Sequence, residues 1–284
     1  MDIQDYIQDY IQDYIQDAIS NFKKLIEDSI KKDGSSGITA AIRSSEPIFK
    51  IHEAVKHALI SKGINKDLIC PSIGSNSPEL KLAGKLKQKD QDICIKPNNV
   101  DKYQEKLTEE PLDGIKDEYG IEFTRKTLVI NVRSQISSIQ KNFDTLFERT
   151  YAEALNLHAR CPDMVLGEVY LLAVPEYDTK EFSNKLVKFK KKNQELVKKY
   201  IKSFQAITNR ESTKEDYYKY ESICLLIVDF SKTPPKFYNT TNELEENGLL
   251  PKNSTLKYED LSWNTFFDKL LKIYCDRFNI STIK

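Results

Sequence analysis

The chain has 284 residues, of which 39% are hydrophobic and 30% are charged, a composition typical of a globular protein with a solvated surface. Lysine plus arginine and aspartate plus glutamate each number 43, so the net charge gives no general attraction for nucleic acid. The length suits one large domain, or one domain with an appended segment.

The five cysteines are scattered, without a Cys-x-x-Cys pair and without histidines at zinc spacing. They therefore predict reduced thiols and not a disulfide framework or a zinc site. The N-terminus is acidic and does not resemble a signal peptide, and no stretch approaches the roughly 18 apolar residues that a membrane span needs. We expect a cytoplasmic protein with no membrane partner.

The N-terminus repeats the tetrad IQDY three times, over residues 3–14, in a pattern that suggests slippage during DNA replication. Isoleucines four residues apart form a stripe along a helix, and the apolar phase continues to Ile30. The Gly- and Ser-containing stretch 31–37 predicts a linker or a helix end. Residues 1–37 are thus expected to be an N-terminal helix with a linker, and a dimerising or partner-binding role for this helix is the functional alternative.

Amphipathic and alternating patterns then predict a helix, strands and a further helix. The helix over 46–62 has Pro47 in its first turn and Gly63 after its end. Two strands follow, LKLAGKLKQ and QDICIKP, and then a surface insertion rich in Pro, Asn, Asp and Gly over 97–120. The remaining expected elements are a strand at 127–135, a helix at 142–160, a strand at 164–174, a lysine-rich helix at 180–205, a strand at 222–230 and a helix at 261–278.

This order predicts an α/β fold with a mixed central sheet flanked by helices, plus the N-terminal helix. We expect residues 38–284 to form a single domain, with a core at about 46–175 and a C-terminal α/β extension at 176–284.

Residues 180–202 contain nine lysines against two acids, which predicts an amphipathic helix with a cationic outer face. Such a face is often merely solvated. In a DNA-binding protein it would instead contact phosphates, and Lys190, Lys191 and Lys192 are the predicted contacts.

Polar side chains interrupt two of the expected strands. Asp92 begins the apolar run that continues through Ile95, and Asn131 and Arg133 share one face of the strand 127–135. Unpaired charges in a core cost several kcal/mol, so inward-facing polar groups on neighbouring strands predict a site. The alternatives are a turn-capping aspartate and a polar edge of the sheet.

These segments, with the helix that follows Arg133, resemble type II restriction endonucleases built on the PD-(D/E)XK nuclease core. In that family one strand carries an aspartate, and the next carries an acid and a lysine two positions apart. Asp92 resembles the first, whereas Asn131 and Arg133 stand where the acid and the lysine belong. The resemblance implies Asp92, Asn131 and Arg133 as catalytic residues and Asp92 as a Mg²⁺ ligand.

Because Asn131 is not an acid, a second carboxylate must come from elsewhere. Glu148 and Glu153 lie five residues apart on the predicted helix, about 140° around its axis, so at most one points at the site. We select Glu148 as catalytic and Glu53, on the first core helix (46–62), as a second metal ligand. Glu122 is a further option.

Lys85, Lys87 and Lys89 alternate along the strand before Asp92 and share a face, and Lys87 is selected as the substitute for the missing lysine. A solvated stripe is the simpler alternative. Glu168, in the apolar strand 164–174, is expected to form a structural salt bridge with Arg133 or Arg149.

The resemblance implies a Mg²⁺-dependent, sequence-specific endonuclease of double-stranded DNA. It also implies a homodimer and a cognate DNA methyltransferase as genetic partner. Another DNA-acting nuclease on the same core is a variant of this prediction. The alternative from a different class is a non-enzymatic interaction module that binds nucleic acid or protein through its N-terminal and lysine-rich helices.

Overall fold

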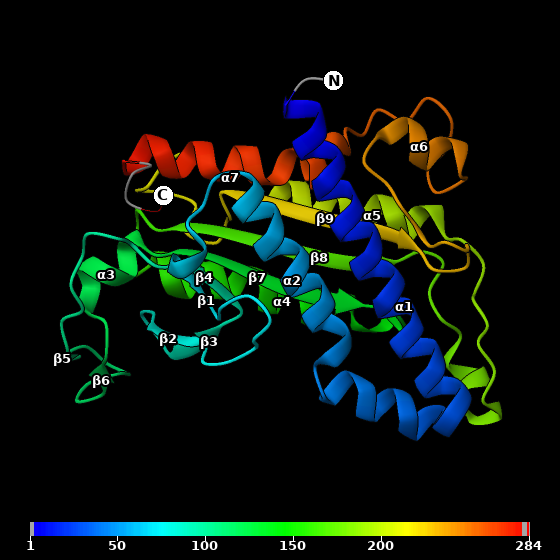
Figure 1. The fold of residues 1–284 in the computed structure, drawn as a ribbon, viewed down its shortest axis with the longest axis horizontal. Helices are drawn as coiled ribbons and strands as arrows, with labels where there is room; N and C mark the ends of the chain where they lie inside the picture. Colours follow the sequence, from blue (N-terminus) through cyan, green and yellow to red (C-terminus); the bar gives the residue numbers. More distant parts are fainter. Residues whose placement is uncertain (1–2, 280–282, 284) are drawn as a thin grey trace.

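The computed structural model describes residues 3–279 and 283, which form three layers, with a mixed sheet between two layers of helices (Figure 1). The α/β class expected from the sequence is confirmed. The helices are α1 Ile3–Arg43, α2 Glu46–Ser61, α3 Gly120–Lys126, α4 Ile139–His158, α5 Gln194–Ala206, α6 Thr241–Glu246 and α7 Trp263–Arg277. Short 3-10 helices are η1 Lys66–Leu68, η2 Thr179–Asn184 and η3 Glu259–Leu261.

The central sheet has six strands in the order β1-β4-β7-β8-β9-β10. The strands β1, β4 and β7 pair antiparallel, β7, β8 and β9 pair parallel, and β10 returns antiparallel to β9. Their bounds are β1 Ile69–Cys70, β4 Ile93–Ile95, β7 Leu128–Gln135, β8 Val165–Ala173, β9 Ser222–Asp229 and β10 Lys236–Phe237. Two small hairpins lie outside this sheet, formed by β2 Leu80–Ala83 with β3 Gln88–Gln91 and by β5 Glu105–Lys106 with β6 Lys116–Asp117.

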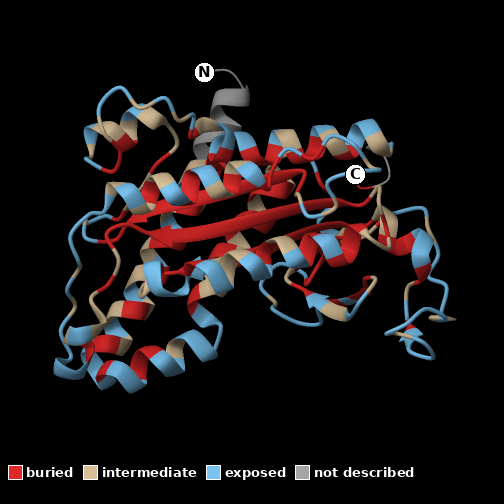
Figure 2. Cartoon of the chain, turned by 180° about the vertical axis from the view of Figure 1, so that it is seen from behind, coloured by how far each residue is buried: buried red, intermediate tan, exposed pale blue. Residues whose placement is uncertain are grey.

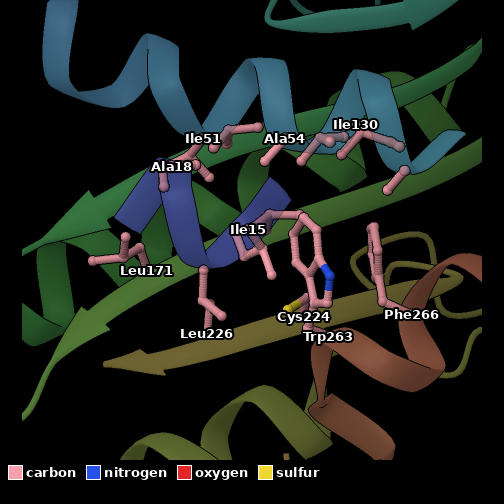
Figure 3. Packing of buried hydrophobic residues seen from close by; sticks show 14 of the residues in the cluster. Ile15, Ala18, Ile51, Ala54, Ile130, Leu171, Cys224, Leu226, Trp263 and Phe266 are labelled. Atoms are coloured by element: carbon pink, nitrogen blue, oxygen red, sulfur yellow. The ribbon is translucent and has the colours of Figure 1, made fainter. Parts of the chain in front are cut away.

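The helices α4 and α5 connect the parallel strands and cover one face of the sheet, whereas α1, α2 and α7 cover the other. Both faces of the central strands are thus covered, and every residue of β8 and β9 is buried (Figure 2). This explains why both strands read as continuous apolar runs in the sequence. Figure 3 shows the face covered by α1, α2 and α7, where Ile15 of α1, Ile51 of α2 and Trp263 of α7 meet over the sheet.

The helix α1 belongs to the main core. From Ile11 to Ile30 its stripe is buried at every turn, and the buried positions are Ile11, Ile15, Ala18, Ile19, Phe22, Ile26 and Ile30. Of the two possibilities expected at 31–37, the structure shows a helix end and not an extended linker: one helix ends at a kink at Gly34, and a second helical segment continues to Arg43. Only Gly34 departs from helical angles, with φ 60° and ψ −132°, and it bends the helix where the carbonyl of Phe182 lies against its backbone.

Of the lysine-rich helix expected at 180–205, only the second half forms an α-helix. The 3-10 helix η2 ends at Asn184, the next residue, Lys185, is left-handed, and residues 186–193 run as irregular chain to the start of α5. The Tyr177 and Phe189 rings pack together with centroids 4.6 Å apart, and the same two residues form a β-bridge. Asn193 then caps α5 by accepting a hydrogen bond from the Leu196 N–H.

The expected elements at 46–62, 127–135, 142–160, 164–174, 222–230 and 261–278 are confirmed to within a few residues. Across residues 3–279 and 283, no helix combines the length and apolar character that crossing a membrane requires.

The burial of the α1 stripe leads to a stability prediction. Ile15→Ala should lower the free energy of unfolding by about 2–5 kcal/mol, because it removes a fully buried side chain and leaves a cavity. Asp17→Ala, at an exposed position two residues away, should change it by less than about 0.5 kcal/mol. Chemical denaturation of both variants tests this, and equal small effects would mean that α1 is an appendage.

Candidate active site

The candidate site begins where β4 separates from β7. Ile93 pairs with Ile130, but the chain bends at Asp92 while β7 continues to Gln135. The ladder therefore stops, and the Val132 N–H lacks a strand partner. Asp92 Oδ2 accepts its hydrogen bond at 2.8 Å. The half-buried carboxylate of Asp92 is thereby fixed against the backbone between Asn131 and Arg133.

Next to it, two buried polar residues face each other across β7 and β8. Asn131 is the register partner of Glu168, and they are 1% and 0% exposed. Neither the amide group of Asn131 nor the carboxylate of Glu168 has a hydrogen-bond partner among the described residues. Buried polar atoms are rarely left unpaired, so this row marks a place where a ligand, an ion or water is expected.

Two cations lie over this row. Arg133 Nε lies 2.8 Å from Glu168 Oε1, without hydrogen-bond alignment, and Arg133 Nη2 pairs with Glu153 of α4. Glu153 also pairs with Lys89 of β3. Four elements thus contribute to one charged cluster of Lys89, Asp92, Arg133, Glu153 and Glu168, called here the charged cluster.

A hydrogen-bonded junction positions the β2–β3 hairpin and with it Lys89. The Asn156 side chain on α4 accepts from the N–H groups of Leu86 and Lys87 and donates to the Lys87 carbonyl. The contact is so close that a Cβ at Gly84 would lie 2.1 Å from Asn156 Nδ2 and 2.6 Å from its carbonyl oxygen. Only glycine fits at position 84, and the hairpin is thereby held against α4.

Burial shifts the pKa values of two groups near Asp92. It raises the pKa of Glu168 to about 8, against the opposing charge of Arg133 and with added repulsion from Glu153 and Asp92. It lowers the pKa of His52 on α2, although the Asp92 carboxylate acts in the opposite direction. His52 is therefore neutral near pH 7, and its buried Nε2 has no partner among the described residues.

A cavity of about 300 Å³ lies beside the second half of β7. Arg133 forms part of its wall, so one residue of the charged cluster borders an accessible space. The other walls come from α1, the start of α2 and the start of α4, through Phe22, Ile26, Ile42, Pro47, Ile48, Asn142 and Leu146.

The structure brings Asp92, Asn131 and Arg133 together, and it corrects three other expectations. Glu148 is exposed on α4, and Glu153 is the glutamate of this helix that points to the cluster. Lys87 is exposed at the hairpin turn, and Lys89 is the lysine that joins the cluster. The carboxylate of Glu53 on α2 accepts hydrogen bonds from Lys56 and from the Gly74 N–H, and the second bond anchors the loop at 71–78.

The three lysines selected as DNA contacts lie exposed on the irregular segment 186–193. Lys190 pairs with Glu176, and Lys192 lies 3.3 Å from Asp229. Glu176 also accepts from the Ile139 N–H at the start of α4. The lysines therefore lie at the carboxyl ends of β7 and β8, the end of the sheet along which the cavity runs.

Glu153 and Lys89 were recognised in the sequence only as alternatives, and Glu168 only as a salt-bridged residue. The expected pairing of Glu168 with Arg133 is confirmed. The available signal was a lone acid in a strand that is otherwise apolar, since such a residue must have a local counter-charge.

No protein family, no curated protein and no solved structure matches this chain significantly. Inferences about its function therefore rest on the geometry of the charged cluster.

The raised pKa of Glu168 predicts a pH dependence of stability. The folded state holds the proton up to about pH 8, whereas the unfolded chain releases it near 4.5, so stability falls as the pH rises between these values. Glu168→Gln removes this loss. In metal-free buffer its free energy of unfolding relative to wild type should increase by about 1–4 kcal/mol from pH 5 to pH 9. Denaturation curves at both pH values measure this, and a constant difference would contradict the assignment.

Proposed function

We propose that this chain is a metal-dependent endonuclease that hydrolyses phosphodiester bonds of double-stranded DNA, of the type II restriction class. The observation that carries the proposal is the hydrogen bond from the Val132 N–H to Asp92. It fixes a carboxylate from one strand against Asn131 and Arg133 of the next, which is the arrangement that the PD-(D/E)XK resemblance implies.

The order of the elements supports the same proposal. A helix (α2) precedes three antiparallel strands (β1, β4, β7), and a second helix (α4) leads to a strand (β8) parallel to the third. The expected core of this nuclease superfamily has this order of a helix, antiparallel strands, a helix and a further strand. Fold order alone does not establish an activity, so the argument depends on the site residues.

The donor atoms present fit a hard cation such as Mg²⁺, which prefers oxygen ligands. Asp92 and Glu168 would supply carboxylates, and Asn131 Oδ1 is a buried acceptor without a partner. Within the described residues no group of three or more His, Cys, Asp and Glu side chains is arranged to hold a metal, so the amide oxygen and water would complete the set. A bound Mg²⁺ polarises the phosphoryl oxygens and makes a water more acidic.

The cations of the cluster have a role of their own in this chemistry. Negative charge develops on the phosphoryl oxygens as the P–O bond breaks, and positioned cations stabilise it. Arg133 borders the cavity, and the Lys89 side chain is 35% exposed, so both are accessible from outside. Arg133 keeps its proton under all relevant conditions and stabilises charge without transferring a proton.

The position of the lysines supports DNA as the substrate. Lys190, Lys191 and Lys192 lie at the end of the sheet along which the cavity runs. Cations in this place would hold the duplex backbone near Arg133 without reading its sequence. A homodimer and a cognate DNA methyltransferase are part of the proposal, because the restriction class implies them.

The interaction-module alternative gains no support from these observations. From Ile11 onward, the isoleucine stripe of α1 that a partner would have to recognise is buried in the core of the same chain. The lysine-rich helix on which it also relied is replaced by irregular chain as far as Asn193.

Asp92→Ala should reduce Mg²⁺-dependent cleavage of plasmid DNA by at least about 10³-fold, because it removes a metal carboxylate that acts in the chemical step. Affinity for DNA should change by less than about threefold, since phosphate contacts dominate it. Cleavage assays with Mg²⁺ and with EDTA, and gel-shift titration in Ca²⁺ at fixed salt, measure the two effects.

Asp90→Ala is the matched control, because Asp90 lies two residues away on β3 and is exposed. This variant should cleave at close to the wild-type rate. Wild-type protein that never cuts DNA with Mg²⁺, across a broad mixture of sequences, would sink the proposal. Normal cutting by Asp92→Ala would remove Asp92 from the site.

Lys191 should contribute more to DNA binding than Lys190. Within the described residues Lys191 has no ion-pair partner, whereas Lys190 must leave Glu176 before it can contact a phosphate. Lys191→Ala should reduce the salt dependence of binding by about one unit, and Lys190→Ala by less. Affinities measured at several salt concentrations test this, and an unchanged slope for both variants would identify the segment as a solubilising surface.

A further inference from the structure

The buried row of Asn131 and Glu168 is not explained by packing. Their neighbours on the same face of β7 and β8 include Val129, Leu166 and Tyr170, which belong to the apolar core beneath α4 and α5. An apolar pair at these positions would extend that core without a desolvation cost. The chain instead keeps an amide and a carboxylate whose four polar atoms lack hydrogen bonds among the described residues.

The charges around this row do not balance. Three carboxylates, those of Asp92, Glu153 and Glu168, face two cations, Lys89 and Arg133. Glu153 pairs with both cations, so Arg133 is the one cation that pairs with Glu168 among the described residues, at a distance without hydrogen-bond alignment. The buried Tyr220 hydroxyl also lies beside Glu168. When all three carboxylates are ionised, the cluster carries one more negative charge than positive charges, and Glu168 is its most deeply buried member.

Asp92 belongs to the same place. The register joins Ile93 to Ile130, so Asp92 lies one step further along, beside Asn131, and Asn131 is paired with Glu168. Asp92, at the bend just before β4, thus forms a row at one level of the sheet with Asn131 of β7 and Glu168 of β8.

We propose that Glu168 is the second carboxylate of a divalent-cation site, which it forms with Asp92 and the side-chain amide oxygen of Asn131 (Oδ1). When no metal ion is bound, the Arg133 guanidinium takes its place. This inference rests on the proposed function only in taking Asp92 as a metal ligand. The acid missing from β7 is then supplied by β8, one strand over and in register with Asn131.

The proposal gives Arg133 two positions. Without a cation its guanidinium neutralises Glu153 and Glu168. A divalent cation beside Glu168 would repel the positively charged guanidinium of Arg133. Arg133 then turns toward the cavity that it already borders. Arg133 would then meet a phosphate only after the metal has bound.

Binding of Mn²⁺ to the metal-free protein tests the site without any DNA. Isothermal titration calorimetry should show a loss of affinity of about tenfold or more in Glu168→Gln and in Asp92→Asn, because each loses a carboxylate ligand. Glu195→Gln is the matched control, since the Glu195 side chain is 80% exposed on α5, and it should bind Mn²⁺ within about twofold of wild type. Circular dichroism establishes that each variant is folded.

Arg133→Gln provides a result of opposite sign. Removing the resident cation should increase Mn²⁺ affinity severalfold, and Mn²⁺ should raise the thermal midpoint of this variant more than that of wild type. A purely structural Arg133 would give an unstable variant with unchanged or weaker Mn²⁺ binding. If Arg133→Gln does not fold, the comparison of Glu168→Gln with Glu195→Gln decides alone.

The outcomes separate this inference from the proposed function. Wild-type binding of Mn²⁺ that depends on Glu168, in a protein that cuts no DNA, supports the cation site and overturns the nuclease. Wild-type Mn²⁺ affinity in Glu168→Gln, in a protein that cuts DNA with Mg²⁺, overturns the cation site and leaves the nuclease standing. No measurable Mn²⁺ binding to wild type by calorimetry overturns the site as well.

Discussion

The fold depends on keeping one carboxylate, Glu168, inside its most buried sheet. All nine residues of β8 are buried, and the strand has covered neighbours on both sides. Burial holds this carboxyl group protonated up to about pH 8. When it ionises it needs a partner, which β7 supplies as Arg133, and α4 supplies Glu153 to hold Arg133. The charged cluster thereby ties α4 to the sheet through the pair of Glu153 with Arg133.

The early end of β4 is the second constraint. A regular antiparallel partner along the whole of β7 would have covered Val132 and the residues after it with backbone. The bend at Asp92 leaves this edge open, and a side chain replaces the missing strand. The chain loses ladder hydrogen bonds at this point and gains an accessible cavity beside Arg133. An irregularity of this kind is more informative about function than the regular parts of the sheet.

The sequence predicted the elements well where one periodicity dominates. The predictions agree with the structure for β8, β9, α2, α4 and α7. In these elements burial of one or both faces gives a regular spacing of apolar residues in the sequence. It failed at residues 185–193, where lysines and apolar residues alternate with helical spacing but a left-handed Lys185 and the Asn193 cap impose a different path. It placed a helix end near Gly34, where the structure has a kink, but it did not predict the second helical segment that follows and runs to Arg43.

The site was predicted in part, for a related reason. Asp92, Asn131 and Arg133 are close in the sheet and follow from strand alternation. The choice of Lys89 over Lys87 depends on how the hairpin docks through Gly84 and Asn156, 72 residues apart in the chain. The choice of Glu153 over Glu148 depends on the rotation of α4. Neither long-range docking nor helix rotation is encoded in local spacing.

The length of the tetrad repeat at the N-terminus determines how its isoleucines are placed around the α1 helix. Each four-residue unit turns a helix by about 400° and lengthens it by about 6 Å, so successive isoleucines are offset by about 40°. Among the residues whose burial the structure describes, α1 places Ile11, in the third unit, in the core, together with positions through Ile30 and also Ile38. Gain or loss of a unit upstream of Ile11 would leave unchanged the spacing of the buried positions from Ile11 to Ile30, which α1 packs into the core.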